Sequence, residues 1–138
     1  MARYRPDIVK LARSALVNMR KHLPGTVEMV YDNYNALVIG FSPNERPSDA
    51  IFSIALYPRW VNVFFLQGAT DLADPERLLR GSGSQVRSIR LTSSQDLDKP
   101  AVRALIAQAI ARADPPIDPK ARRKLVVRAV SAKQRPRR

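Results

Sequence analysis

Two arginines flank a turn of small residues in the segment RGSGSQVR, which runs from Arg80 to Arg87. Small residues leave backbone N–H groups accessible and arginines attract anions, so this pattern could hold a phosphate group. The residues that would do so are Gly81, Ser82, Gly83 and Arg87. The turn lacks the Gly-Lys-Ser/Thr ending of a P-loop, and it is predicted to run from helix to strand, the reverse of the P-loop order. A helix stop at Gly81 followed by a plain turn explains the same residues, and we favour that interpretation.

The C-terminal end of the chain is strongly basic. From Pro115 onward there are nine Lys or Arg residues and a single acidic residue, Asp118, in a chain whose net charge is +12. Such a segment attracts nucleic-acid phosphates without reading sequence, and it attracts an anionic membrane surface less convincingly. A solvated tail without a partner is the alternative. The basic residues concerned are Lys120, Arg122, Arg123, Lys124, Arg128, Lys133, Arg135, Arg137 and Arg138.

Four aromatic residues gather near the predicted strand ends: Tyr31, Tyr34, Tyr57 and Trp60. Exposed aromatic rings could stack on bases or line a groove, whereas buried ones belong to the core. We favour the core for most of them, because large aromatic side chains are usually well buried.

Residues for catalysis or metal binding are scarce. His22 is the single histidine and there is no cysteine, which excludes thiol nucleophiles and cysteine-zinc sites. His22 lies near the expected end of a helix, where a cation is favourable in its own right. The acidic residues Asp71, Asp74 and Glu76 are explained as loop and helix-start residues, with a carboxylate metal site as the alternative. We therefore assign no catalytic, cofactor or metal residues, and we favour a non-enzymatic protein over the alternative of an enzyme of unknown reaction.

The apolar pattern alternates between helical and strand periods along the chain. Helices are expected from Pro6 to about Leu23, briefly after Asp74 and Pro75, and over 99–113 with Asp98 as the cap. Strands are expected over 26–31, 36–41, 50–57 and 60–66, followed by an edge strand that begins at Val86. These elements predict a single α+β domain with a mostly antiparallel sheet of about five strands, helices packed on one face and a basic C-terminal tail.

The two strongest strands, 50–57 and 60–66, are apolar on both sides. Since two helices can cover one face of the sheet, the second face needs another cover. The alternatives are loops and tail, a second subunit in a homodimer, or an apolar groove for a ligand.

Length and composition are those of one globular domain, which we place at 1–114, with a basic extension over 115–138 that is partly helical or disordered. The tail helix would start at Asp118 and Pro119 and continue to Val130. The absence of cysteine fits a reducing compartment. No signal-peptide pattern opens the chain and no apolar run approaches a bilayer span, so we expect a cytoplasmic protein without a membrane partner.

The segment from Gly68 to Arg90 also resembles the YdhG-like family of small, mostly uncharacterised bacterial domains. The resemblance rests on Gly68, Asp74, Pro75, Leu79, Gly81, Gly83 and Arg87, with Glu28 and Tyr31 earlier in the chain. Together these span roughly 8–113. Relatives often carry lysine where this chain has Ser84, which weakens any anion-binding role for the turn. Some relatives are labelled frataxin-like iron chaperones, a role that the net positive charge argues against.

Two functions are therefore expected as alternatives. The first is a non-enzymatic binding or interaction module with weak, sequence-independent affinity for nucleic acid through the basic tail. The second is a small-molecule or metal-handling protein, similar to an iron chaperone, that uses the hairpin groove or the acidic loop.

Overall fold

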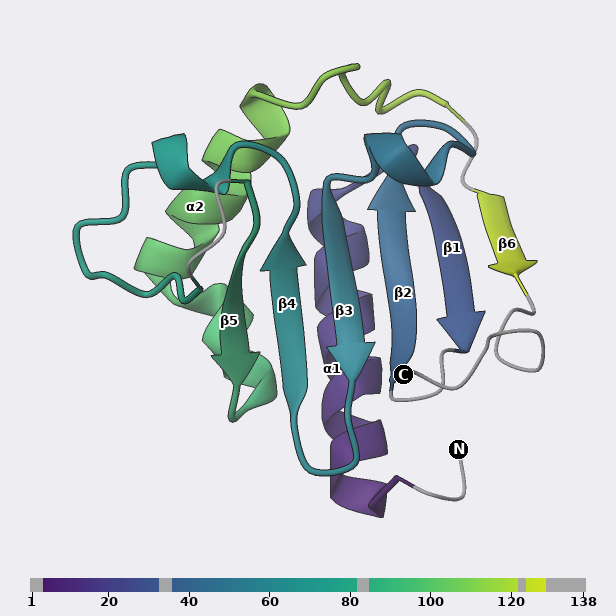
Figure 1. Ribbon diagram of the computed structural model, residues 1–138, viewed down its shortest axis with the longest axis vertical. Coiled ribbons are helices and arrows are strands. Elements are labelled where there is room, and N and C mark those ends of the chain that lie inside the picture. Colours follow the sequence, from purple (N-terminus) through teal and green to yellow (C-terminus); the bar gives the residue numbers. More distant parts are fainter. Residues whose placement is uncertain (1–3, 33–35, 82–84, 122–123, 129–138) are drawn as a thin grey trace, which may run out of the picture.

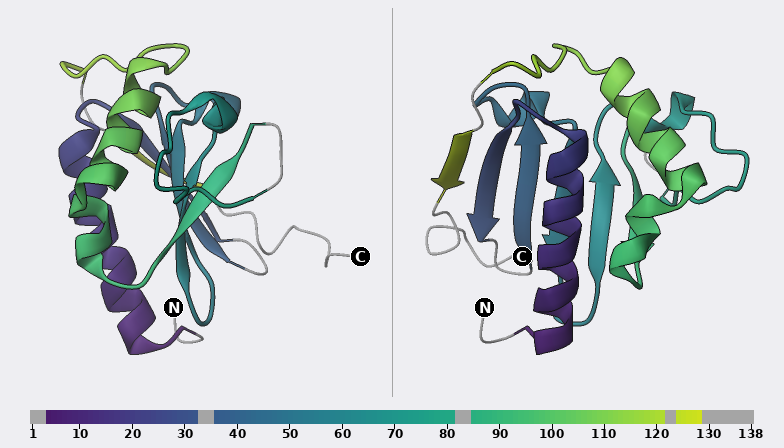
Figure 2. Two further views of the ribbon diagram at one scale, coloured as in Figure 1. Left: turned by 90° about the vertical axis from the view of Figure 1, so that its left-hand side faces the viewer. Right: turned by 180° about the vertical axis from the view of Figure 1, so that it is seen from behind.

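The computed structural model describes residues 4–32, 36–81, 85–121 and 124–128. Within these ranges the chain forms one α+β unit, in which α1 (Pro6–His22) and α2 (Pro100–Ala111) pack on the same face of a six-stranded sheet (Figures 1 and 2). The strands are β1 (Val27–Asp32), β2 (Leu37–Ser42), β3 (Phe52–Leu56), β4 (Val61–Phe65), β5 (Arg87–Leu91) and β6 (Lys124–Arg128). The predicted fold class is confirmed.

Helix α1 forms where the sequence pattern places it. Pro6 occupies the first turn, where a missing N–H costs nothing, and Asp7 lies near the positive end of the helix dipole. The buried residues recur every three or four positions: Ile8, Ala12, Ala15 and Met19. This stripe turns α1 towards the sheet.

The sheet has the order β5-β4-β3-β2-β1-β6. Strands β1 to β5 pair antiparallel with their neighbours, and the predicted edge strand after Val86 is confirmed as β5. On the face towards the helices, Phe41, Phe52 and Phe65 lie side by side in one row of the register and are fully buried. The rings of Phe52 and Phe65 meet edge to face, with 5.2 Å between their centroids. This aromatic row is the centre of the core.

The short helix expected after Asp74 is not formed. A helix cap would accept hydrogen bonds from the N–H groups two and three residues on. The Asp74 carboxylate instead accepts from the N–H groups of Leu78 and Leu79, both at 2.9 Å, and its carbonyl accepts from Arg77 N at 3.0 Å. Arg77 has a φ of 55°, in the left-handed region. The segment is a compact loop held by the carboxylate rather than a helical turn.

Helix α2 is confirmed, but its expected cap is wrong. The residue at the N-cap position is Lys99, which makes no side-chain capping bond. Asp98 ends the 3-10 helix η3 (Ser94–Asp98), and its carboxylate accepts a hydrogen bond from Asn18 Nδ2 at 2.9 Å. Asp98 therefore links η3 to α1 instead of starting α2.

The helix expected in the basic extension is also wrong over the part that the structure describes. Residues 124–128 form β6, which pairs in parallel with β1 and gives the sheet a sixth strand. The sequence KLVVR is rich in β-branched residues, and β1 offers an unpaired edge to it. The apolar residues that suggested a docked helix thus dock as a strand.

Among the described residues, no helix combines the length and the apolar character needed to cross a bilayer.

Candidate nucleic-acid interface

The sheet has one face without helices. In Figure 1 this face is towards the viewer, with α1 and α2 behind the strands. Strand registers and the alternation of side chains place a defined set of residues on it, which we call the open face. The open face consists of Met29, Tyr31, Val38, Gly40, Ser53, Ala55, Tyr57, Trp60, Asn62, Phe64, Ser88 and Arg90.

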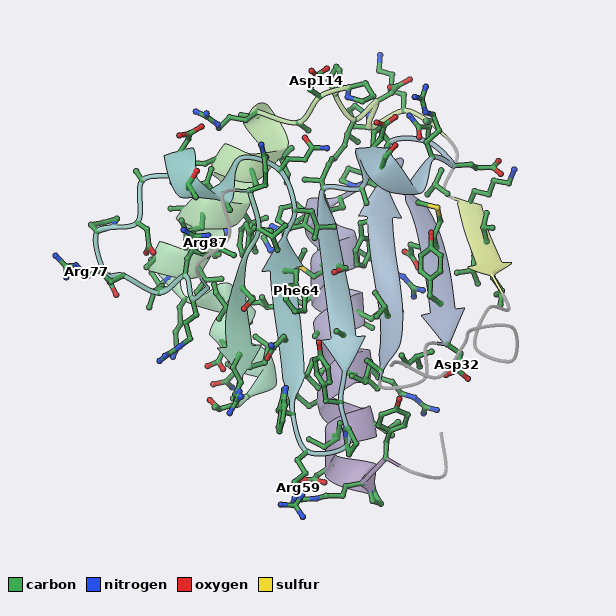
Figure 3. The ribbon with its side chains drawn as sticks, viewed as in Figure 1. Asp32, Arg59, Phe64, Arg77, Arg87 and Asp114 are labelled. Atoms are coloured by element: carbon green, nitrogen blue, oxygen red, sulfur yellow. The ribbon has the colours of Figure 1, made fainter. Side chains whose placement is uncertain are left out.

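The middle of the open face carries small residues. Ser53 stands between Gly40 and Phe64 in the register, and Ala55 stands between Val38 and Asn62. Phe64 is only partly buried and projects near the centre of the sheet (Figure 3). Ser53, Ala55 and Gly40 are buried, so the exposed aromatic surface in the middle of the open face is that of Phe64.

A second aromatic surface lies at the end of the β3–β4 hairpin. The rings of Tyr57 and Trp60 are 5.4 Å apart with 32° between their planes. The Arg90 guanidinium lies 4.6 Å from the Trp60 ring centroid, in a cation–π contact. Tyr57 and Trp60 are partly buried, while Arg90 and the hairpin-tip residue Arg59 are exposed. The hairpin end therefore combines stacking surface with positive charge.

Asn62 has a buried polar atom on the open face. Its Oδ1 accepts no hydrogen bond from any residue that the structure describes. The residues opposite Asn62 on the neighbouring strands are Ala55 and Arg90. An unpaired buried acceptor is costly, and a bound N–H or O–H donor would relieve that cost.

The predicted aromatic residues are partly brought together. Tyr57 and Trp60 form one surface, while Tyr31 lies across the sheet on β1, its hydroxyl 3.7 Å from Met29 Sδ. Tyr34 is outside the described residues. Sequence reasoning missed Phe64, Asn62 and Arg90 as members of this surface. Counting every second residue onward from Trp60 would have found Asn62 and Phe64.

The glycine-rich turn does not form a phosphate cradle within the described residues. Gly81 has a φ of 125°, which favours glycine, but no helix precedes it, so the helix-stop explanation is wrong. The Arg87 guanidinium donates to the carbonyl of its neighbour Val86 at 3.1 Å. Ser82 and Gly83 lie outside the described residues.

The basic extension is described as far as β6. Lys120 is exposed, Lys124 forms an ion pair with Glu45, and Arg128 ends β6. The remaining basic residues named for nucleic-acid binding lie outside the described residues: Arg122, Arg123, Lys133, Arg135, Arg137 and Arg138.

The acidic residues of the loop are used separately. Asp71 lies 3.5 Å from Arg112, and Asp74 accepts from backbone N–H groups. Over the described ranges, no three His, Cys, Asp or Glu side chains are grouped so that they could hold a metal ion.

His22, the remaining chemical candidate, is half-buried at the end of α1. Burial, followed by the positive charges of Arg103 and Lys21, lowers the pKa of His22, and Asp98 opposes that shift. The surroundings of His22 therefore favour its neutral form.

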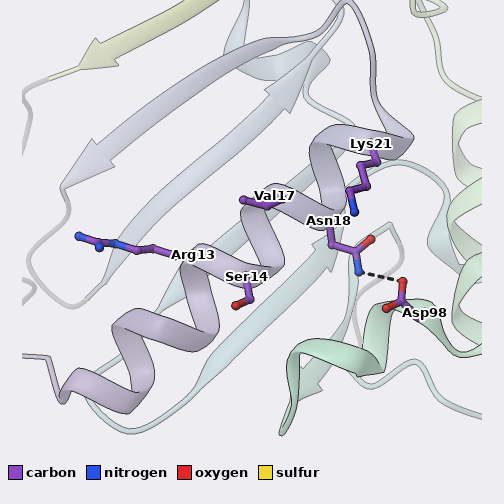
Figure 4. Close-up of a pocket in the computed structure, with 6 residues that line it drawn as sticks. All are labelled: Arg13, Ser14, Val17, Asn18, Lys21 and Asp98. Atoms are coloured by element: carbon purple, nitrogen blue, oxygen red, sulfur yellow. Dashed lines mark hydrogen bonds between the residues drawn. The ribbon is translucent and has the colours of Figure 1, made fainter.

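A depression of about 360 Å³ lies on the outer side of α1, which we call the α1 groove. Its lining consists of Arg13, Ser14, Val17, Asn18 and Lys21 of α1, with Asp98 of η3. Asn18 and Asp98 bond to each other, and Arg13 points away from them (Figure 4). The polar groups here already have partners or face solvent, so this groove has fewer ligand-binding features than the open face.

Comparisons with protein-family models, with curated proteins and with solved structures give no match to this chain.

Proposed function

We propose that this protein is a non-enzymatic module that binds single-stranded nucleic acid without sequence preference. The observation that carries the proposal is the arrangement of Trp60, Tyr57 and Arg90 on the open face. Single-strand binding proteins combine aromatic surfaces, on which bases stack, with basic groups that follow the phosphates. The open face supplies the first, and Arg59, Arg90 and the basic extension supply the second.

Single strands suit this surface better than duplexes. Bases in a duplex are stacked on one another, and their faces are closed to protein side chains. The partly exposed rings of Phe64, near the middle of the open face, and of Trp60, at its end, offer surfaces on which unstacked bases can lie.

The test uses the intrinsic fluorescence of Trp60, the single tryptophan of the chain. Titration with a dephosphorylated mixed-sequence DNA or RNA oligonucleotide at low salt should quench this fluorescence. Phe64→Leu and Arg90→Gln should each weaken binding by roughly 5- to 150-fold, the equivalent of about 1–3 kcal/mol per stacked base. Arg13→Gln, on the α1 groove, removes the same charge away from the open face and should change the affinity little.

Two results would overturn the proposal. One is an unchanged Trp60 spectrum at saturating oligonucleotide, since bases would then be absent from the hairpin end. The other is equal weakening by Arg13→Gln and Arg90→Gln, which would mean that net charge alone attracts the strand.

Self-association through the open face is a second proposal. Phe64, Tyr31 and Val38 are partly exposed there, and two such faces could cover each other in a homodimer. Sedimentation velocity over a range of concentrations measures the assembly. Because both partners would use one surface, added oligonucleotide should dissociate such a dimer, and a dimer that persists with bound oligonucleotide would place its interface elsewhere.

We also propose that the chain belongs to the YdhG-like family and that the protein is cytoplasmic. The first is supported by the sequence resemblance and the second by the absence of cysteine. The alternative of a small-molecule or metal-handling protein draws no support from the acidic loop, whose carboxylates Asp71 and Asp74 are engaged by Arg112 and by backbone N–H groups.

A further inference from the structure

We propose that a pocket beyond the outer edge of β5 binds the phosphate group of a small phosphomonoester. This β5 pocket has a volume of about 200 Å³, and four of its lining residues are basic: Arg77, Arg80, Arg90 and Lys99. It lies between the loop that follows Asp74, strand β5 and the start of α2. It is separate from the glycine-rich turn of the sequence prediction, although Arg80 adjoins that turn.

The acid in the pocket cannot balance this charge. Asp96 Oδ2 accepts hydrogen bonds from Thr92 N at 2.7 Å, Thr92 Oγ1 at 3.1 Å and Ser93 N at 3.1 Å, while Oδ1 lies 3.2 Å from Lys99 Nζ. Burial alone would raise the pKa of Asp96, but these hydrogen bonds outweigh burial and hold the pKa below its usual value. Asp96 and Lys99 therefore neutralise each other.

Arg80 and Arg90 remain without an acidic partner in the part of the chain that the structure describes. Arg90 lines the pocket from β5, while its guanidinium lies against the Trp60 ring of the open face. The Arg77 side chain extends away from the sheet (Figure 3), so this residue shapes the pocket through its loop. Arg80 is therefore the uncompensated guanidinium that we assign to a phosphate group in this pocket.

The wall formed by the loop is held in place before any ligand arrives. Its first half is fixed by the Asp74 carboxylate, which accepts from Leu78 N and Leu79 N. Its second half is fixed by a bridge in which Arg80 N donates to Ser88 O at 2.8 Å and Ser88 N donates to Arg80 O at 2.9 Å. The backbone of Arg80 is thus fixed against β5, which reduces the backbone entropy lost on binding.

Size and polarity limit the ligand. The volume is below the roughly 300–1,000 Å³ of pockets for drug-sized ligands, so a phosphate group with a few attached atoms fits better than a nucleotide. The remaining lining residues, Leu78, Ile89 and Val102, are apolar and partly or fully buried. These apolar side chains can contact the carbon atoms of a phosphate ester. A free inorganic phosphate ion has no apolar part to contact them.

Isothermal titration with glycerol 3-phosphate, inorganic phosphate and unphosphorylated glycerol tests the pocket at constant ionic strength. Glycerol 3-phosphate should bind at least as tightly as inorganic phosphate, and glycerol should not bind. Arg80→Gln should weaken the binding of glycerol 3-phosphate at least about tenfold, since a hydrogen bond to a charged group is lost, and Arg80→Lys should keep part of it. Arg13→Gln should have no effect.

The proposal fails if glycerol 3-phosphate does not bind, or if Arg13→Gln and Arg80→Gln weaken its binding equally. An oligonucleotide with and without a terminal phosphate distinguishes the source of the phosphate group. Preference for the phosphorylated end, lost in Arg80→Gln, assigns the pocket to strand ends, whereas equal affinities assign it to free phosphomonoesters. Because the open-face test uses dephosphorylated strands, either proposal can fail without the other.

Discussion

Arg20 and Glu28 form a two-pronged ion pair that joins the end of α1 to β1. Arg20 Nε and Nη2 donate to the two carboxylate oxygens of Glu28, both at 2.8 Å. Glu28 is only 1% exposed, whereas the Arg20 side chain is about one-third exposed. The hydrogen bond to Glu28, against the opposing effect of burial, raises the pKa of Arg20 above its usual value. The pair gives the buried carboxylate on the helix-covered face of the sheet a charged partner.

Removing Arg20 should leave the buried Glu28 charge without a partner. We expect Arg20→Ala to lower the free energy of unfolding by about 2–3 kcal/mol, below the full effect of a fully buried pair because Arg20 reaches solvent. Arg20→Lys should cost less, since lysine keeps the charge and loses the second prong. Urea unfolding at neutral pH measures both. Arg5→Ala breaks the exposed Arg5–Asp7 pair and should cost less than about 1 kcal/mol. Equal losses of unfolding free energy in Arg20→Ala and Arg5→Ala would show that the Arg20–Glu28 pair stabilises the fold no more than the exposed pair does.

Gly25 should tolerate no side chain. Its φ is 81°, and a Cβ at this position would lie 2.1 Å from the carbonyl oxygen of Asp118. Gly25→Ala should therefore destabilise the fold by at least about 2 kcal/mol, since backbone strain adds to the displacement of the segment leading to β6. Thermal unfolding gives the size of the loss. Gly40→Ala is the matched control, because a Cβ at Gly40 has only a 3.8 Å contact. If Gly25→Ala is as stable as the parent protein, the backbone at Asp118 moves away from the added Cβ at little cost.

His22 should make stability depend on pH. Its pKa is lowered below the ordinary value of 6.5, so the unfolded chain takes up a proton at a higher pH than the folded chain does. Stability should fall as the pH drops from about 6.5 through the folded-state pKa, and the loss should level off below it. His22→Gln should reduce the change in melting temperature between about pH 7.5 and pH 5. If the melting temperature of His22→Gln changes with pH as much as that of the parent protein, the pH dependence comes from other groups.

Ending the chain after Arg128 should weaken electrostatic binding while keeping the sheet. This truncation removes four basic residues, Lys133, Arg135, Arg137 and Arg138, and leaves β6 complete. If these residues contact phosphates, the slope of log affinity against log salt for a single strand should become shallower by up to about 3, at about 0.7 per contact. Fluorescence titrations at several salt concentrations give the slope. An unchanged slope would exclude the end of the tail from the interface.

The elements that the sequence predicted well have regular local periods. The stripe of Ile8, Ala12, Ala15 and Met19 determines α1, and the alternation after Val86 determines β5, because each pattern has one buried face to satisfy. The predictions that failed depend on partners distant in the sequence. Asp74 has the sequence context of a helix start, yet its carboxylate bonds farther along the chain, to Leu78 and Leu79.

The candidate sites divide in the same way. Tyr57 and Trp60 were identified because they flank a hairpin turn, which is a local feature. Arg90 joins them only through the pairing of β4 with β5, and the β5 pocket forms only when the loop, β5 and α2 meet. Contacts between such distant segments leave no regular spacing in the sequence. The arginines of the β5 pocket could therefore not be identified from the sequence.

The pairing of β6 with β1 joins residues from opposite ends of the chain. The chain is synthesised from its N-terminus, so β2 and β3 are available for pairing long before Lys124–Arg128. Until Lys124–Arg128 has emerged from the ribosome, one edge of β1 stays unpaired. Contacts so distant in sequence close slowly, because the intervening loop must be ordered first. The last step of folding is therefore expected to be the capture of the C-terminal strand, and until then the edge of β1 is the part of the protein most open to pairing with another chain.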